Sequence, residues 1–447
     1  MNKKHILPLV VSGLFCAGMT FSLARPLAEE QQTDKVVEVI KNQDPVMNKQ
    51  ISLSFPQEEQ VIDILRPNVV NYINDMHSQR EELGIENDYK INDYFARADV
   101  PDAPGGRYTK DTDKVDVRNY AKGKTESKSK LVSLVFSKEG FEEEDVFKVK
   151  YGLKEDLSDA KEIETTDTYV TVTNLLANET YYWQVSSGET SSAVQSFKTR
   201  EGFRMITASG ISNIRDMGGR LVEGGKHIKQ GIIFRGSELV EETYYDGGSE
   251  HSKTLTPENK AILRDELGIK YEVDFRGDSE ANYITESPLK DEDHEDIEYM
   301  RIPNMTAYDY LIKSSSESLM SGLKNMFLKF KNANEKHVYF HCWGGADRTG
   351  TAGFLLGGVL GMSLTDLIVD FELTSFGGNN RYHDYNDPEK NVFRFPSLLY
   401  EVVEGSTLSP YRTEGALLKD VIAGFLINKV GLTQEDIDEL RANLLED

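Results

Sequence analysis

One stretch decides the fold of the downstream half of this 447-residue chain: His341-Cys342-Trp343-Gly344-Gly345-Ala346-Asp347-Arg348-Thr349-Gly350. The apolar run 337–341 before it alternates like a strand, and the apolar run 351–360 after it predicts a buried helix. The polar residues between them therefore predict a loop that leads from the end of a strand into the N-terminus of a helix.

This loop has the composition of an oxyanion-binding site. Gly344 and Gly345 permit backbone conformations in which successive N–H groups turn inward, and the helix N-terminus adds its dipole. The guanidinium of Arg348 can bind two oxygens of a phosphate at once. The same positive field favours the thiolate of Cys342, which is its nucleophilic form, and the hydroxyl of Thr349 can donate to that thiolate. We therefore expect phosphate chemistry rather than a structural cysteine.

The pattern His-Cys-x5-Arg-Thr-Gly resembles the signature of cysteine-dependent protein tyrosine phosphatases. Three further motifs precede the loop in order, at 212–219 (SNIRDMGG), 233–237 (IFRGS) and 273–276 (VDFR). Together they resemble the bacterial tyrosine phosphatase family that includes secreted enzymes with protein and phosphoinositide activity. The resemblance covers about 203–445 and implies an α/β phosphatase domain, with a central sheet and flanking helices, over 201–447.

The resemblance implies a two-step hydrolysis that needs no metal or other cofactor, because the loop and Arg348 supply the positive charge. Cys342 is the expected nucleophile, and Arg348 is expected to stabilise the phosphate oxygens in the transition state. The general acid is either Asp347, inside the loop, or Asp274, which follows a predicted strand. We favour Asp347 because related phosphatases carry an acid in the loop; its alternative role is to bond loop amides.

Other residues are expected to shape the phosphate site. In the family interpretation, Arg215, Arg235 and Arg276 lie at strand ends and help to hold the loop. Without the family, Arg235 and Asp274 would be strand-end residues that could form a salt bridge. His341 is expected to orient the loop or to tune the cysteine. The predicted substrate-binding residues are Trp343, Gly344, Gly345, Ala346, Thr349, His341, Arg215 and Arg235.

Ala346 bears on the substrate, because several relatives carry Lys immediately before the loop aspartate. Polyphosphorylated headgroups gain most from extra cations, so this position favours phosphotyrosine over phosphoinositide or inositol-phosphate substrates. Trp343, Tyr308 and Tyr310 are candidate walls for a tyrosine ring, although a core position is the favoured interpretation for the two tyrosines. A hypothesis of another class is a catalytically weak, exported binding module.

Composition limits the partners. The chain has 75 acidic residues against 51 Lys and Arg, a formal charge of −24. This acidity argues against nucleic acid and anionic membrane surfaces as partners. The two cysteines, Cys16 and Cys342, exclude a disulfide framework and a Cys-rich zinc site. The expected partner is a phosphorylated protein or a small phosphomonoester.

The first 24 residues have the layout of a signal peptide. Lys3 and Lys4 precede an apolar run over 6–24, which ends at a small-x-small cleavage site, Ser22-Leu23-Ala24. We expect a secreted or extracytoplasmic protein with no stable membrane span after cleavage. A lipid anchor on Cys16 is ranked lower, because Phe15 precedes it. Residues 25–116 show no clear pattern, since Pro67 interrupts the helical patches there.

Residues 117–200 predict a small all-β sandwich. Five β-rich runs, at 131–136, 146–151, 169–173, 181–186 and 194–199, alternate with polar stretches. The segment 175–185 (LLANETYYWQV) resembles the late strands of fibronectin type III domains. Its residues Tyr181, Trp183 and Val185 alternate onto one face, so Trp183 is expected in the core. We expect the sandwich to recognise a protein partner.

Overall fold

The computed structural model describes residues 48–82, 89–90, 115–122, 127–246, 248–281, 284–382 and 416–447. The predicted signal peptide, 1–24, and much of 25–116 lie outside these residues. No helix among the described residues is both long enough and apolar enough to span a bilayer.

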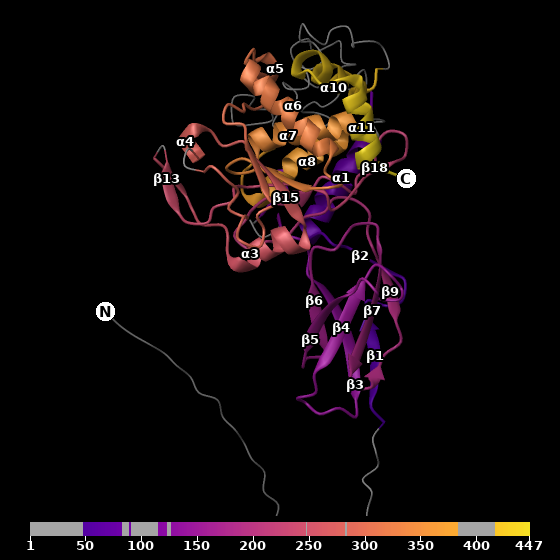
Figure 1. Cartoon of the computed structure of the whole chain (residues 1–447). Coiled ribbons are helices and arrows are strands. Elements are labelled where there is room, and N and C mark those ends of the chain that lie inside the picture. Colours follow the sequence, from indigo (N-terminus) through magenta and orange to yellow (C-terminus); the bar gives the residue numbers. More distant parts are fainter. Residues whose placement is uncertain are drawn as a thin grey trace, which may run out of the picture. The chain divides into compact units, whose positions relative to one another are not determined.

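A five-stranded sheet organises the downstream half, as the resemblance predicts for a mixed α/β domain (Figure 1). Its order is β10 (Arg215–Asp216), β12 (Ile233–Gly236), β17 (His337–His341), β15 (Ile269–Asp274) and β16 (Glu298–Arg301). The last four strands are parallel, and β10 pairs antiparallel with β12. Cys342 therefore follows the carboxyl end of the central strand, the edge where open α/β sheets place their ligands.

Both faces of this sheet are covered, which explains why β17 is buried from Val338 to its end. Val338 and Phe340 of β17 belong to one hydrophobic core, and Tyr339 belongs to a second core on the opposite face. The larger helices are α6 (Glu317–Lys331), α7 (Asp347–Leu360), α8 (Leu364–Glu372), α10 (Leu418–Phe425) and α11 (Gln434–Leu444). Ser363 caps α8, and Thr433 begins α11 with a capping box.

Shorter elements complete this half. Thr256 caps α3, with Pro257 in its first turn. The short helical elements are α3 (Pro257–Ala261), η3 (Ile262–Glu266), α4 (Asp278–Ala281), α5 (Asp309–Lys313), η4 (Leu373–Gly377) and η6 (Leu426–Val430). Two small strand pairs are β11 (His227–Ile228) with β18 (Leu445–Glu446), and β13 (Tyr244–Asp246) with β14 (Ser249–His251).

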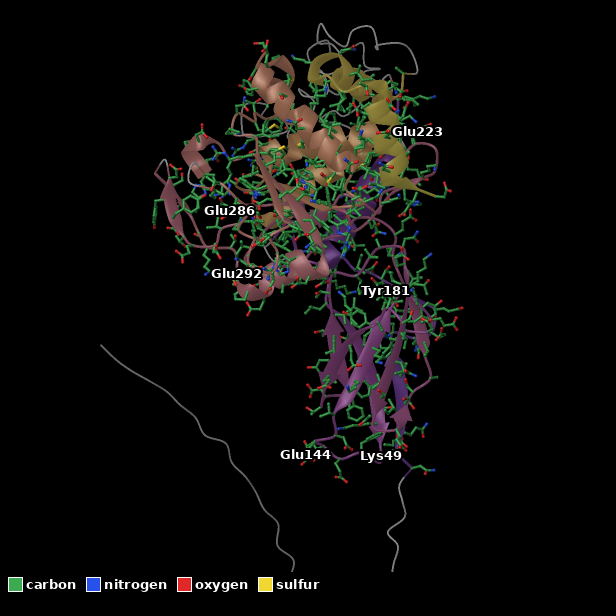
Figure 2. All side chains as sticks on the ribbon, viewed as in Figure 1. Lys49, Glu144, Tyr181, Glu223, Glu286 and Glu292 are labelled. Atoms are coloured by element: carbon green, nitrogen blue, oxygen red, sulfur yellow. The ribbon has the colours of Figure 1, made fainter. Side chains whose placement is uncertain are left out.

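The upstream half contains two sheets. One has the order β1 (Gln50–Phe55), β3 (Val132–Glu139) and β6 (Tyr169–Val172). The other runs β2 (Gln60–Ile62), β9 (Gln195–Thr199), β7 (Thr180–Ser187), β4 (Phe147–Gly152) and β5 (Lys161–Thr165), with β8 (Thr190–Ser191) on β7. On β7, Tyr181, Trp183 and Val185 are buried, as the alternation predicts; Tyr181 is labelled in Figure 2.

The structure differs from the sequence interpretation before residue 117. Elements form within 25–116, a segment whose sequence shows no clear pattern. β1 belongs to one sheet of the sandwich and β2 to the other, and α1 (Pro67–Glu82) begins at the proline that interrupts the helical pattern. Proline is tolerated in the first turn of a helix. Val69, Tyr72 and Met76 of α1 pack into the core shared with α7 and α8.

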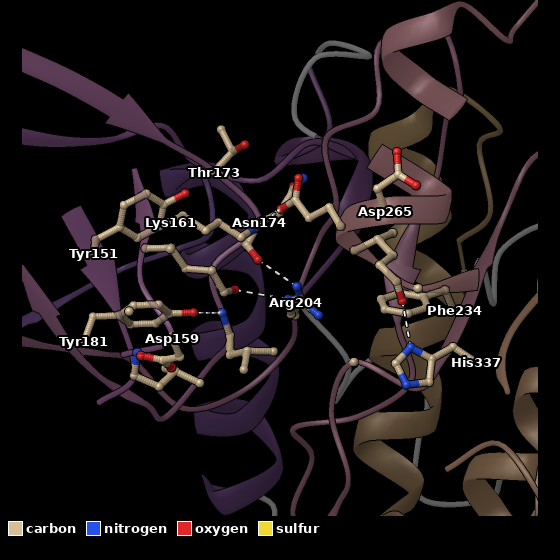
Figure 3. Close-up of a pocket in the computed structure, with 18 residues that line it drawn as sticks. Tyr151, Asp159, Lys161, Thr173, Asn174, Tyr181, Arg204, Phe234, Asp265 and His337 are labelled. Atoms are coloured by element: carbon tan, nitrogen blue, oxygen red, sulfur yellow. Dashed lines mark hydrogen bonds and ion pairs between the residues drawn. The ribbon is translucent and has the colours of Figure 1, made fainter. Parts of the chain in front are cut away.

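Residues 174–177, which follow β6, meet the start of the downstream half. The guanidinium of Arg204 donates to the carbonyls of Asn174 and Leu175, at 2.6 and 3.1 Å, and pairs with Asp216 at 2.8 Å. A cavity of about 290 Å³ lies beside these contacts (Figure 3). His337, at the amino end of β17, lines it, so this cavity is at the opposite end of the strand from Cys342.

Candidate active site

The loop after β17 spans Cys342 to Ala346. Cys342 is 3% exposed and forms no disulfide. Ala346 is the N-cap of α7 and makes no side-chain hydrogen bond to it. The first N–H groups of the helix are therefore uncapped by a side chain, and the helix dipole concentrates positive charge there. This end of α7 is suited to an anion.

Three successive loop carbonyls are held from outside the loop. The donors are the Glu238 N–H to Trp343 (2.9 Å), the amides of Asn213 and Asn379 to Gly344 (3.3 and 3.0 Å), and Asn213 and Arg235 to Gly345 (3.0 and 2.9 Å). In a trans peptide, the C=O and the following N–H point in opposite directions. The N–H groups of Gly344, Gly345 and Ala346 therefore point away from these donors, and no acceptor for them occurs among the described residues. They form a nest for an oxyanion.

Gly345 and Gly353 are required by close approach. Gly345 has φ +65°, and a Cβ there would lie 2.3 Å from the carbonyl oxygen of Gly236. In α7, a Cβ on Gly353 would lie 2.7 Å from Nη1 of Arg235. The two glycines let the loop and the helix close around the buried arginine.

A buried cluster lies behind the loop, in which three arginines share the carboxylate of Asp370 on α8. The ion pairs are from Arg215 (2.9 Å), Arg220 (2.9 Å) and Arg235 (2.6 Å). The cluster carries an excess of positive charge in a site that excludes water. Burial, followed by the neighbouring Arg215, lowers the pKa of Arg235 to about 9, while the attraction of Asp370 and Cys342 opposes this shift. The predicted loop-holding role is direct for Arg235, whereas Arg215 reaches the loop through Asn213.

Arg348, in the first turn of α7, is paired with Glu280 of α4. Its Nη2 donates to Glu280 Oε1 at 2.7 Å, its Nη1 donates to the other carboxylate oxygen, and Nη1 also donates to the Phe275 carbonyl at 2.9 Å. Burial lowers the pKa of Arg348, but the bonds to Glu280 and the negative field of Cys342 raise it more, so the net shift is upward. Glu280 thus holds the guanidinium beside the loop.

Asp347, the first residue of α7, has partners on both carboxylate oxygens. Arg381, which follows η4, donates from Nε to Oδ1 and from Nη2 to Oδ2, both at 2.5 Å. The hydroxyl of Tyr308 also donates to Oδ1. Burial raises the pKa of Asp347, but the bonds and charge of Arg381 lower it more, so the carboxylate form is favoured.

Asp274, at the end of β15, is fully buried and fully paired. Arg276 donates to it from its backbone N–H (2.8 Å) and from Nε and Nη2, and Tyr299 donates at 2.9 Å. Burial raises the pKa of Asp274, but the charges of His341 and Arg276 lower it by more, so the net pKa is about 2. An acid with every acceptor site filled and no exposure is poorly placed to give a proton to a substrate.

His341, at the end of β17, belongs to the same buried network. Its Nε2 lies 2.9 Å from Glu272, and its Nδ1 lies 3.2 Å from the Cys342 carbonyl. Ligand atoms of Glu272, Asp274 and His341 lie within 4.8 Å of one another, a spacing that could hold a metal ion. Because Asp274 is already paired with the buried Arg276, the arrangement is better described as a buried hydrogen-bond network at the start of the loop.

The predicted aromatic walls have different environments. Trp343 is 41% exposed, and its ring lies 4.9 Å from His251, which stacks on Tyr244 at 4.7 Å. Tyr308 is only 7% exposed and is engaged with Asp347, so the core interpretation fits it. Tyr310 is 59% exposed, so the core interpretation is wrong for it. Trp343 is therefore the loop aromatic open to a substrate ring.

The remaining predicted residue, Thr349, is buried, and its hydroxyl has no hydrogen-bond partner in the described part of the chain. Sequence reasoning missed several residues that hold the site: Asp370, Glu280, Arg381, Asn213 and Asn379. The motif 212–219 includes Asn213, but nothing near the other four distinguishes them from the many acids and polar residues of the chain.

A family model described as the tyrosine phosphatase family matches residues 206–446, which is more than half of the chain. The matched range holds the whole five-stranded sheet and the cysteine loop. No curated protein matches the sequence.

Proposed function

Because this chain belongs to the tyrosine phosphatase family, we propose that it hydrolyses phosphomonoesters through a phosphocysteine on Cys342, with phosphotyrosine on proteins as the preferred substrate. Family membership supports a phosphatase; the intermediate and the substrate are the proposed parts. One observation carries the proposal: three consecutive loop carbonyls are bound from outside, which directs their N–H groups to the other side of the loop that Cys342 begins.

In the first step, the thiolate of Cys342 attacks phosphorus in line with the ester oxygen. A sulfur–phosphorus bond forms and the ester phosphorus–oxygen bond breaks. The loop N–H groups and Arg348 stabilise the equatorial oxygens, where charge gathers in the transition state. Asp347 donates its proton to the leaving alcohol or phenol.

In the second step, water attacks the phosphocysteine. Asp347, now a carboxylate, accepts a proton from that water, the sulfur–phosphorus bond breaks, and inorganic phosphate leaves. The positive charge that surrounds the loop favours the departing thiolate, and the hydroxyl of Thr349 is available to donate to it. Asp347 is preferred to Asp274 because it is partly exposed, whereas Asp274 is enclosed by its partners.

The preference for phosphotyrosine is supported by two features of the loop. The exposed ring of Trp343 offers an apolar wall for a phenyl group, and His251 and Tyr244 support it from behind. Ala346 contributes no charge where relatives carry lysine, so a substrate with several phosphates gains no extra cation from that position. A phosphoinositide or inositol-phosphate substrate is the alternative.

Hydrolysis of p-nitrophenyl phosphate by the wild type and by Cys342→Ser tests the reaction. We expect the variant to lose about 10⁴-fold or more in kcat, as removal of a covalent nucleophile does, and to keep its affinity for phosphate. EDTA should leave turnover unchanged, because the loop and Arg348 supply the positive charge. Equal turnover by the two proteins, or a loss with EDTA that a divalent ion restores, would contradict the proposal.

We also propose that the protein is exported. The support is the sequence of residues 1–24, which lie outside the described residues. The mass of the protein recovered outside the cytoplasm should correspond to a chain that begins at Arg25. A diacylglycerol-sized adduct on Cys16 would instead indicate a lipid anchor.

A further inference from the structure

The pairing of Asp347 conflicts with its proposed role. A general acid must carry a proton when the substrate is bound, but Arg381 and Tyr308 donate three hydrogen bonds to the Asp347 carboxylate. These bonds stabilise the ionised form. Among the described residues, three groups with charge or a titratable proton act on it: Tyr308, which precedes α5, Arg381, which follows η4, and Arg348 on α7 itself.

Arg381 is placed to leave this carboxylate without leaving the loop. Its side chain is partly exposed, and its Nη1 donates to the carbonyl of Asn379. The amide of Asn379 in turn donates to the Gly344 carbonyl at 3.0 Å. The same short segment therefore touches both a carbonyl of the oxyanion nest and the acid at the start of α7.

Tyr308 fixes the other side of Asp347. It has φ +58°, a left-handed conformation that a tyrosine rarely adopts, and its N–H donates to the Thr351 hydroxyl at 2.9 Å. Strain of this kind persists only where the surroundings enforce it. Tyr308 is thus held on the carboxylate, whereas the side chain of Arg381 borders solvent and is 24% exposed.

We propose that Arg381 transfers its guanidinium from Asp347 to the oxyanion bound in the loop, so that phosphate binding and proton uptake by Asp347 occur together. This inference rests on the proposed function and deepens it. Arg381 thereby supplies, from a distant part of the chain, a cation that the loop residue Ala346 does not.

The coupling has a simple electrostatic basis. A tetrahedral dianion competes with the carboxylate for the guanidinium, and its charge also disfavours a second anion beside it. Once Arg381 has left, Asp347 takes one proton from solvent. That proton goes to the ester oxygen as the phosphorus–oxygen bond breaks. Linkage is reciprocal, so protonating Asp347 must strengthen anion binding by the same factor by which anion binding favours the proton.

Sulfate binding by variants of the full chain tests this coupling. Sulfate is a tetrahedral dianion that does not titrate near neutral pH, and Cys342→Ser removes the thiol that would otherwise take up a proton. In that background we would measure sulfate affinity by calorimetry, at constant ionic strength, for the parent and after adding Asp347→Asn, Arg381→Ala or both.

Asp347→Asn should tighten sulfate binding roughly tenfold, because Arg381 is no longer held by a carboxylate. Arg381→Ala should weaken it by a similar factor. The gain from Asp347→Asn should largely disappear when Arg381 is alanine, which separates release of the arginine from a simple loss of repulsion. The parent should also take up a proton on binding, seen as a dependence of the measured heat on buffer ionisation enthalpy, and Asp347→Asn should not.

Two further variants guard the interpretation. Arg381→Lys keeps the positive charge, so it should retain part of the sulfate affinity. It replaces Arg381→Ala in the test if the alanine variant folds poorly. Arg200→Ala removes an exposed arginine paired with Asp63, outside the site, and should change nothing. An equal gain from Asp347→Asn with and without Arg381, or no gain, would overturn the exchange while leaving the phosphatase proposal intact. Absence of sulfate binding in every variant, together with no Cys342-dependent turnover, would overturn both.

Discussion

Asp274 and Asp347 are two carboxylates at the edge of the same loop, and their surroundings differ. Asp274 ends a strand of the sheet, its side chain has no exposure, and a single arginine two residues away binds both its oxygens. Asp347 begins a helix, 36% of its side chain is exposed, and its arginine comes from 34 residues further along the chain. Both are ion pairs, but one is enclosed and the other borders solvent.

The hydrogen bonds of a carboxylate do not by themselves distinguish a general acid from a structural residue. Both carboxylates have lowered pKa values, and in both cases an arginine opposes the effect of burial. What separates them is whether the partner can be exchanged. A buried pair that loses one member leaves an uncompensated charge, whereas a pair at the mouth of a site can be replaced by a charged substrate.

Asp347→Asn tests the functional side of this comparison, and we expect it to have a larger effect than Asp274→Asn or Ala346→Lys. Loss of general acid catalysis should lower kcat on a phosphotyrosine peptide by about 10²–10³-fold. The loss of kcat on p-nitrophenyl phosphate should be much smaller, because p-nitrophenolate leaves with little need for protonation. The ratio of the two losses is the measurement. Equal losses would reassign Asp347 to holding the loop.

Asp274→Asn tests the structural side. The change removes the carboxylate that binds Nε and Nη2 of the buried Arg276 and leaves its pair with Glu238 at 3.1 Å. We expect the free energy of unfolding to fall by about 3 kcal/mol, the lower end for a broken buried ion pair, measured by denaturant titration. Because the folded pKa is depressed to about 2, the ionised pair stabilises the fold above the ordinary pKa of aspartate, and this contribution is lost as the pH falls towards 2. A leaving-group-dependent loss of kcat, with unchanged stability, would make Asp274 the acid instead.

Ala346→Lys is the smallest expected effect and sharpens the comparison from the loop itself. The new ammonium would lie next to Asp347 and add a cation near the phosphate site, so phosphoinositide turnover should rise a few-fold relative to phosphotyrosine. Side-by-side phosphate release from the two substrates measures this. If the wild type already prefers the lipid, or the ratio does not change, something outside the loop determines specificity.

The local parts of the site could be predicted from the sequence. The run 337–341, two glycines and an apolar helix predict a strand, a tight loop and a helix N-terminus, and the structure forms them. Trp183 could be placed in the sandwich core because β strands alternate strictly. Each of these signals lies within a few residues of the feature that it predicts, so the prediction does not depend on tertiary contacts.

The long-range parts could not be predicted. Glu280 and Asp370 are two of the 75 acidic residues of the chain. Only in the folded protein does Glu280 pair with Arg348 and Asp370 lie among three arginines. β1 and β2 are short edge strands whose partners lie 80 or more residues away, so their local composition carries little information. The same limit hid Arg381, the residue on which the proton state of the proposed acid depends.

The outward carbonyl bonds of the loop also have a consequence for folding order. The side-chain donors to Gly344 and Gly345 come from as far as 132 residues upstream and 35 residues downstream. Contacts of such sequence separation carry a large loop-closure cost and form late. The nest is therefore complete only when the sheet and Asn379, beyond α8, are in place. A polypeptide still emerging during synthesis would hold its cysteine without the means to activate it until residue 379 has been added.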